Sequence, residues 1–113
     1  MDRNRMRGFE ELVLLGVLAT GDDAYGISVQ KVLADELGRT PSLGAVYTAL
    51  DRLLQKGWIC SEMADPKPVR GGRRKRQYRL AEEGLARVAE MRRIRESLWN
   101  RGAPELGEGG ALG

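Results

Sequence analysis

The stretch LGAVYTALDRLLQKGWICSEM, residues 43–63, carries a helical pattern that changes into a strand pattern at a single glycine. Over residues 43–56 the apolar side chains recur every three or four positions, which is typical of one buried helix face. These apolar positions are Leu43, Val46, Leu50, Leu53 and Leu54. After Gly57, residues 58–63 alternate between two sides, as a short strand does. The sequence therefore predicts a helix followed directly by a strand.

The residues upstream predict two more helices. Residues 25–37 form a helical pattern, and Gly38 stands where the glycine that ends a helix is expected. Pro41 then predicts a stop for this helix, and Ser42 predicts an N-cap for the helix that begins at residue 43. Residues 9–19, FEELVLLGVLA, predict a first helix that is apolar on almost every side. A small domain covers one side of such a helix, so the other side indicates a partner subunit.

The basic charge of the chain is concentrated downstream of the first strand. The 113 residues include 19 Lys or Arg and 16 Asp or Glu, and six of the basic residues lie in RGGRRKRQYRL, residues 70–80. Without this stretch, 13 basic residues face 16 acidic ones, so the excess is local and indicates one polyanion contact. Residues 74–80 alternate as a second strand, after a loop rich in proline and glycine. Together the two strands predict a hairpin with a long basic loop.

A last helix is expected to begin near Glu82 and to end soon after Trp99. Its apolar stripe consists of Leu85, Val88, Met91, Ile94 and Leu98. Three helices, two strands and a helix make a mainly α fold with a two-stranded β-wing, the winged helix-turn-helix order. The expected units are a DNA-binding domain over residues 1–80, a C-terminal dimerisation helix over 81–100 and a flexible Gly-rich tail over 101–113.

The composition argues against an enzyme and against a membrane protein. The chain has no histidine, no metal-ligand cluster and no phosphate loop, so we expect no catalytic residue, metal or cofactor. The single Cys60 and the lack of a signal peptide favour a reducing cytoplasmic setting. The longest apolar run, residues 12–15, is too short to span a bilayer.

The third helix and the wing hold the candidate DNA contacts, since the third helix of this fold lies in the major groove. The start of that helix can hold a phosphate on backbone N–H groups, and Thr48 can reach a base edge. The expected contacts there are Ser42, Gly44, Ala45, Tyr47 and Thr48, with Arg52 a turn beyond. In the wing they are Gly71, Gly72, Arg73, Arg74, Lys75 and Arg76.

Each of these candidates also has a plainer interpretation. Ser42 can be a simple N-cap, Tyr47 a half-buried packing residue, and Arg52 part of a solvated face beside Asp51. The basic run can be a solvated loop. A winged-helix module that binds protein or RNA is the alternative function, because the fold alone does not dictate the ligand.

Four motifs resemble the PadR family of transcriptional regulators, in its short form with one C-terminal helix. They are ELVLLGVLA at 11–19, AYGISVQ at 24–30, LGAVYTALDRLLQKGWI at 43–59 and GGRRKRQYRLAEEG at 71–84. The resemblance runs in order from about residue 9 to residue 99. One departure is Ala81, where related sequences place a Ser or Thr N-cap.

The resemblance implies a homodimeric repressor that binds pseudo-palindromic double-stranded operators and releases them on binding a small, often aromatic, effector. It implies dimerisation through the first and last helices, here Leu14 and Val17 together with the stripe of the last helix. Tyr25 resembles a family phosphate contact, or is an interior wedge. Trp99 resembles an aromatic that stacks a flat effector at the dimer axis, or is an anchor packed on the first helix.

Overall fold

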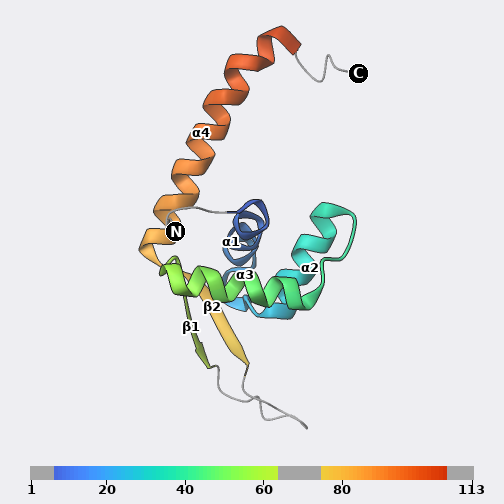
Figure 1. The fold of residues 1–113 in the computed structure, drawn as a ribbon, viewed down its shortest axis with the longest axis vertical. Helices are drawn as coiled ribbons and strands as arrows, with labels where there is room; N and C mark the ends of the chain where they lie inside the picture. Colours follow the sequence, from blue (N-terminus) through green and yellow to red (C-terminus); the bar gives the residue numbers. More distant parts are fainter. Residues whose placement is uncertain (1–6, 64–74, 107–113) are drawn as a thin grey trace.

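The computed structural model describes residues 7–63 and 75–106, with side chains as far as residue 103. Within these ranges, helices α1 to α4, the short 3-10 helix η1 and strands β1 and β2 make the winged helix-turn-helix fold that the sequence predicts (Figure 1). Their bounds are α1 Gly8–Thr20, η1 Gly21–Asp23, α2 Gly26–Leu37, α3 Leu43–Lys56, β1 Ile59–Met63, β2 Arg76–Leu80 and α4 Glu82–Leu106.

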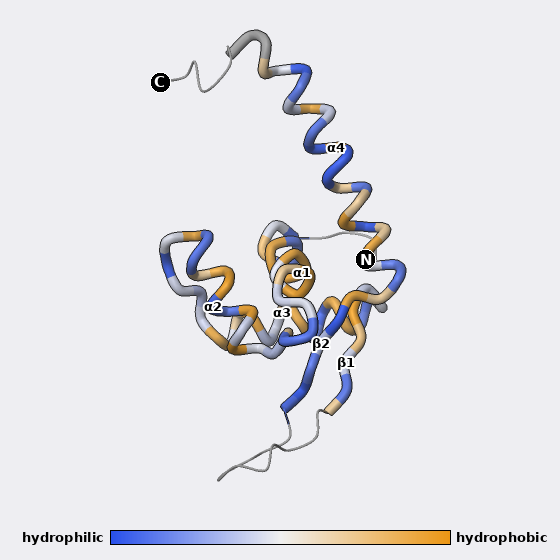
Figure 2. Tube along the Cα trace, turned by 180° about the vertical axis from the view of Figure 1, so that it is seen from behind, coloured by the Kyte–Doolittle hydropathy of each residue, from blue (hydrophilic) through white to orange (hydrophobic). Residues whose placement is uncertain are grey.

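One aliphatic core joins the first three helices to the sheet. Its most deeply buried large side chains are Trp58, Leu14, Leu50, Leu53, Val13, Val17, Val29 and Val46. Figure 2 shows the apolar colouring gathered along α1, which carries Val13, Leu14 and Val17. α1 and α2 approach closely at Gly16, where a Cβ atom would lie 3.1 Å from Cγ1 of Val29. Burial of these side chains is the main force that holds the helices together.

Local signals define the ends of α3 as the sequence predicts. The Ser42 hydroxyl accepts a hydrogen bond from the backbone N–H of Ala45, at 3.0 Å. Gly57 ends the helix with φ of 78°, a left-handed conformation that glycine adopts without steric cost. Gly38 ends α2 in the same way, with φ of 73°. The end of α2 and both ends of α3 are therefore set by the local chemistry of these three residues.

The two strands form an antiparallel ribbon in which Ile59 pairs with Leu80 and Met63 with Arg76. Ile59 and Tyr78 are buried against the helices, so this face of the ribbon continues the core. The backbone N–H of Tyr78 donates to the carbonyl of Ala24, at 2.8 Å. β2 is thus hydrogen-bonded to the segment that leads into α2, which fixes the wing relative to the helix-turn-helix.

α4 begins at Glu82 as predicted, and the Ala81 carbonyl accepts the first bond from the N–H of Leu85, at 3.0 Å. The prediction that it ends near residue 100 is wrong, because the helix continues to Leu106. Gly102 lies within this helix and lowers its stability by about 1 kcal/mol. The part of the expected tail beyond residue 106 lies outside the described residues. α4 projects away from the other elements (Figure 1).

None of the helices over residues 7–63 and 75–106 is both long enough and apolar enough to cross a membrane.

Candidate nucleic-acid interface

The start of α3 presents an open surface made of small residues. Ser42, Gly44, Ala45 and Thr48 are all exposed. A Cβ atom at Gly44 would have no neighbour within 4 Å, so no part of the described chain requires a glycine there. Backbone N–H groups at a helix start lack intrahelical partners, and the helix dipole is positive at this end. The geometry suits a negatively charged group that approaches the backbone closely.

Tyr47 lies between the two helices of the helix-turn-helix pair. Its side chain covers Gly26 so closely that a Cβ atom at Gly26 would collide with the ring and the hydroxyl. The residue is still 40% exposed. Its ring is therefore a packing element of the α2–α3 contact, and the two interpretations of Tyr47 are compatible.

Tyr25 is the N-cap residue of α2 and is half-buried, which fits the wedge interpretation in part. Its backbone N–H donates to Oγ of Ser28, at 2.8 Å. The ammonium of Lys75 lies 5.7 Å from the centre of its ring, within the range of a cation–π contact. The loop end of β2 and the start of α2 are thus brought together at one place.

In the described part of the wing, the two cations Lys75 and Arg76 have different partners. Lys75 lies over Tyr25, whereas Arg76 donates from Nη1 to Oγ of Ser61, at 2.9 Å. Both are exposed. Gln77 donates to the Asp22 carbonyl, a second link from β2 to the loop before α2. The other wing candidates, Gly71, Gly72, Arg73 and Arg74, lie outside the described residues.

Arg52 has a partner that the sequence does not indicate. Its Nη1 lies 3.4 Å from Oε2 of Glu10 on α1, and Nζ of Lys56 lies 2.6 Å from Oε1 of the same carboxylate. Glu10 is 4% exposed. Burial alone would raise the pKa of Glu10, but the hydrogen bond and charge of Lys56, helped by Arg52, outweigh it and lower that pKa. The guanidinium of Arg52 is therefore directed towards α1.

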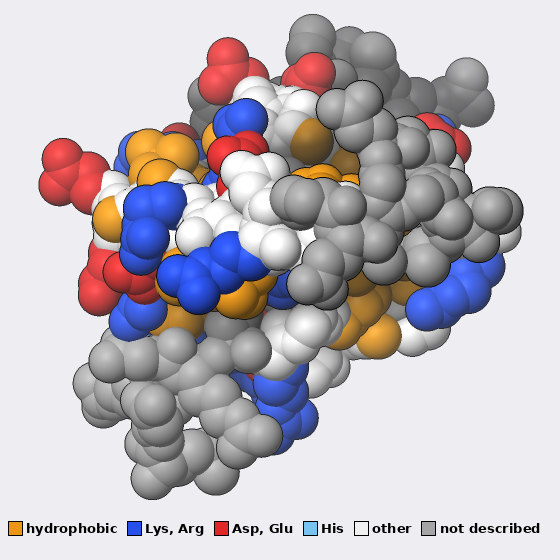
Figure 3. Space-filling view, turned by 90° about the horizontal axis from the view of Figure 1, so that it is seen from above, with side chains coloured by type: hydrophobic (Ala, Val, Ile, Leu, Met, Phe, Trp, Pro, Cys, Tyr) orange, Lys and Arg blue, Asp and Glu red, His pale blue; other side chains and the backbone are white. Residues whose placement is uncertain are grey.

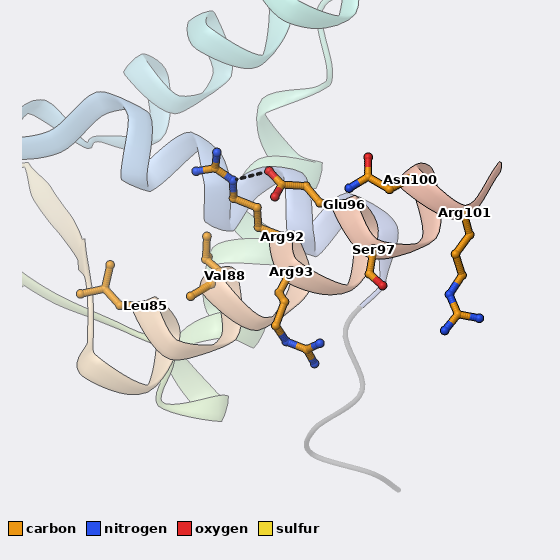
Figure 4. A pocket seen from close by; sticks show the side chains of 9 residues that line it. Leu85, Val88, Arg92, Arg93, Glu96, Ser97, Asn100 and Arg101 are labelled. Carbon is orange, nitrogen blue, oxygen red and sulfur yellow. Dashed lines mark hydrogen bonds and ion pairs between the residues drawn. The ribbon is translucent and has the colours of Figure 1, made fainter. Parts of the chain in front are cut away.

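The apolar stripe of α4 is largely uncovered within one chain. Exposed fractions are 48% for Leu85, 38% for Ile94 and 63% for Leu98, whereas Val88 and Met91 are half-buried. Figure 3 shows exposed apolar side chains interspersed with Lys and Arg on the face seen from the α4 end. In Figure 4, Val88 lies beside Arg92, whose Nε donates to Oε1 of Glu96 at 2.9 Å, and Leu85 lies nearer the start of the helix.

The structure corrects the expected role of α1. Leu14 and Val17 are buried in the core of their own chain, because α2 and α3 cover that side of the helix. They therefore do not face a partner. The large apolar side chains of α1 that are exposed are Leu15, at 37%, and Leu18, at 45%. Sequence reasoning missed this pair because both sides of α1 are equally aliphatic and no polar residue marks the outer one.

A groove of about 310 Å³ runs between α1 and α4. Its apolar part is lined by Leu14, Leu15, Leu18, Val88 and Met91. At one side, Nε of Arg95 donates to Oε2 of Glu11, at 2.8 Å, and joins the two helices. Trp99 does not line the groove and is 66% exposed, so within one chain it is not an anchor packed on α1.

Comparisons with known proteins agree with this architecture. A PadR-family regulator from Clostridium difficile R20291 is 26% identical; the match covers 88% of this chain and 100% of that one, with a TM-score of 0.68. For a PadR-family regulator from Eggerthella lenta DSM 2243, the values are 27% identity, 86% and 82% coverage, and 0.67. RosR of H. salinarum, at 23% identity, 87% and 81% coverage and a TM-score of 0.70, shares the fold. No curated protein matches the chain.

The family assignment rests on the sequence as well as on the fold. The model of the transcriptional regulator PadR-like family matches residues 14–90, which include α2, α3, both strands and the start of α4. Both motifs of the helix-turn-helix pair, AYGISVQ and LGAVYTALDRLLQKGWI, fall inside this range. The chain belongs to the PadR-like family of transcriptional regulators.

Proposed function

We propose that this regulator is a homodimeric repressor that reads a pseudo-palindromic operator with the start of α3 and holds the DNA backbone with its wing. The observation that carries the proposal is the open start of α3, where Gly44 has no neighbour to exclude an approaching phosphate. The hydrogen bond from Tyr78 to Ala24 supports it, because it holds the wing beside the same helix pair.

The proposed contacts divide by chemistry. Thr48 reads a base edge, while the backbone N–H groups near Ser42, Gly44 and Ala45 and the hydroxyls of Tyr25 and Tyr47 contact phosphates. Lys75 and Arg76 add charge from the wing, together with Gly71, Gly72, Arg73 and Arg74 outside the described residues. Arg52 is the weakest member of the set, because one nitrogen of its guanidinium is paired with Glu10, although the side chain is still 41% exposed.

A dimer is supported by apolar surface that one chain leaves uncovered. The proposed interface joins Leu15 and Leu18 of α1 to the α4 stripe of Leu85, Val88, Met91, Ile94 and Leu98. Exposed apolar patches of this kind mark interaction sites in soluble proteins. We propose that an aromatic effector, where one acts, binds between the α4 helices near Trp99 and the α1–α4 groove, and that it weakens DNA binding.

The test is binding of the full chain to the DNA upstream of its own gene, measured by fluorescence anisotropy across a salt series. Affinity should fall with salt with a slope of about −0.9 per neutralised phosphate. Lys75→Ala should reduce that slope by about 1, whereas Thr48→Ala should weaken one operator sequence more than others. Arg101→Ala is the matched charge control, since Arg101 lies near the C-terminal end of α4, a helix that projects away from the wing (Figure 1).

Tight binding to RNA or to an acidic protein, with no preference for any duplex sequence, would favour the interaction-module alternative. Sedimentation equilibrium tests the dimer separately. Leu98→Asp should produce monomers, because it places a charge in the proposed apolar interface. A dimer of unchanged affinity would remove α4 from the interface.

A further inference from the structure

Trp58 connects the end of α3 to the start of α4. It follows Gly57 directly, and its backbone N–H donates to the Leu53 carbonyl of α3, at 3.1 Å. Its side chain is 1% exposed. Nζ of Lys56, in the last turn of α3, lies 5.0 Å from the centre of the Trp58 ring. Trp58 is therefore held to α3 through both its backbone and its ring.

α4 is attached to the same residue by three contacts. The N–H of Ala81 donates to the Trp58 carbonyl, at 3.0 Å. Gly84 sits so close to that carbonyl that a Cβ atom would collide with it. One turn further on, the guanidinium carbon of Arg87 lies 5.2 Å from the centre of the Trp58 ring. The first two turns of α4 thus rest on the residue that ends the α3 segment.

The junction also has a buried anchor on α1. Lys56, which contacts the Trp58 ring, bonds through Nζ to the carboxylate of Glu10. Beyond its first turns α4 becomes exposed, and the hydrogen bond from Arg95 to Glu11 links it to α1. The angle between α4 and α3 is consequently set close to Trp58.

This angle has a large effect at the other end of α3. A 14-residue helix is about 21 Å long, so a rotation of about 10° at its C-terminal end moves its N-terminal end by about 4 Å. Successive base pairs are separated by about 3.4 Å along the duplex. A small change of angle at Trp58 would therefore shift the reading end of α3 by about one base pair.

We propose that the Trp58 junction, defined as Lys56, Trp58, Gly84 and Arg87, is a positioning element that sets the distance between the two reading helices of the dimer. Through that distance it determines which spacing of operator half-sites the protein accepts. The proposal rests on the proposed function, since it needs a dimer formed through α4 and DNA read by α3. The junction itself touches no DNA.

The experiment starts from an operator selected from random duplexes with the full wild-type chain. Duplexes are then made with the same half-sites and a centre that is one base pair shorter or longer. Affinities are measured for wild type, Arg87→Ala, Trp58→Phe, Arg87→Lys and Arg93→Ala. Arg93 is exposed on the same helix and serves as the charge-matched control. Sedimentation equilibrium at the same concentrations shows that each variant is compared as a dimer.

Arg87→Ala and Trp58→Phe should each lower the preference for the selected spacing by at least about fivefold, a coupling of ordinary size. Base preference within a half-site should not change, because α3 itself is unaltered. Arg87→Lys, which keeps the cation over the ring, and Arg93→Ala should keep the wild-type spacing preference. Wild-type spacing preference in folded, dimeric Arg87→Ala and Trp58→Phe would overturn this inference and leave the proposed function intact. Failure of the wild type to select any duplex would overturn the proposed function first, and the inference with it.

Discussion

α3 and α4 both carry an aliphatic stripe, and they differ in what covers it. In α3, Leu50 and Leu53 are fully buried by other elements of the same chain. In α4, Leu98 and Trp99 are 63% and 66% exposed. α3 also has a hydroxyl cap at its start, on Ser42, whereas α4 begins after Ala81, which has no side-chain acceptor.

The difference separates what one chain determines from what it leaves to a partner. A helix shorter than about 15 residues is marginal in water unless packing supports it, and α3 has that packing within its own domain. α4 is 25 residues long, and its outer part, where Leu98 and Trp99 lie, is exposed. We therefore expect changes in α3 to affect folding, and changes in the outer half of α4 to affect self-association.

The largest expected effect comes from a matched pair of truncations, Leu50→Ala in α3 and Leu98→Ala in α4. Leu50→Ala should lower the free energy of unfolding by about 3 kcal/mol, because it leaves a cavity in the core. Leu98→Ala should leave the unfolding of the monomer nearly unchanged and weaken the dimer. Urea denaturation at one fixed, low protein concentration measures the change in unfolding, and sedimentation equilibrium measures the change in dimer affinity. Equal destabilisation of the monomer by both variants would contradict the contrast.

The next effect compares two glycines of α4. Gly84→Ala should cost about 2–3 kcal/mol, because the new methyl group overlaps the Trp58 carbonyl and forces the backbone to shift. Gly102→Ala has open space around it and should stabilise the helix by up to about 1 kcal/mol. Thermal unfolding followed by circular dichroism measures both. A neutral Gly84→Ala would show that the α4 start is not tightly seated on Trp58.

Predictions from sequence succeeded where a signal is local. The bounds of α3 follow from Ser42, Gly57 and a one-sided apolar pattern, and the structure confirms them. The error in α1 has the opposite cause, since Leu14 and Leu15 are identical in kind and only the packing of α2 and α3 decides which is buried. The Glu10–Lys56 bond joins residues 46 positions apart, so no local spacing indicates it.

Of the DNA contacts proposed from the sequence, some depend on local chemistry and others on tertiary packing. The small exposed residues at the start of α3 and the capping role of Ser42 could be anticipated from local chemistry. The diversion of Arg52 to Glu10 could not, because it depends on how α1 lies against α3. The function of the wing cations depends on the molecule that they bind, and the fold of one chain does not determine that molecule.

A smaller effect concerns the ion pairs that hold α3 to α1. The pKa of Glu10 is lowered in the folded chain, so its contribution to stability is present above pH of about 4.5 and is lost as pH falls through the folded value. Glu10→Gln should lower the free energy of unfolding by about 1–2 kcal/mol at pH 7, because a partly buried charge pair is broken. The loss should shrink as the pH approaches 3.

Urea denaturation of both proteins between pH 3 and 7 measures this dependence. Glu11→Gln is the control for the loss of a carboxylate on the same helix, since the partner of Glu11 is the solvent-exposed Arg95. Parallel stability curves for wild type and Glu10→Gln over the whole range would show that the buried carboxylate does not stabilise the contact between α1 and α3.

The smallest expected effect tests whether a new N-cap within the same chain can stabilise the start of α4. Ala81 provides the carbonyl that opens the helix but no side chain to accept from its free N–H groups. Ala81→Ser should add an N-cap and raise the free energy of unfolding by about 1 kcal/mol, the reverse of the loss expected for Ser42→Ala in α3. Because Ala81 lies at the body end of α4, the gain should appear in unfolding and not in self-association. Denaturation and sedimentation of both variants separate the two, and a tighter dimer with unchanged unfolding would mean that the start of α4 is ordered by the partner.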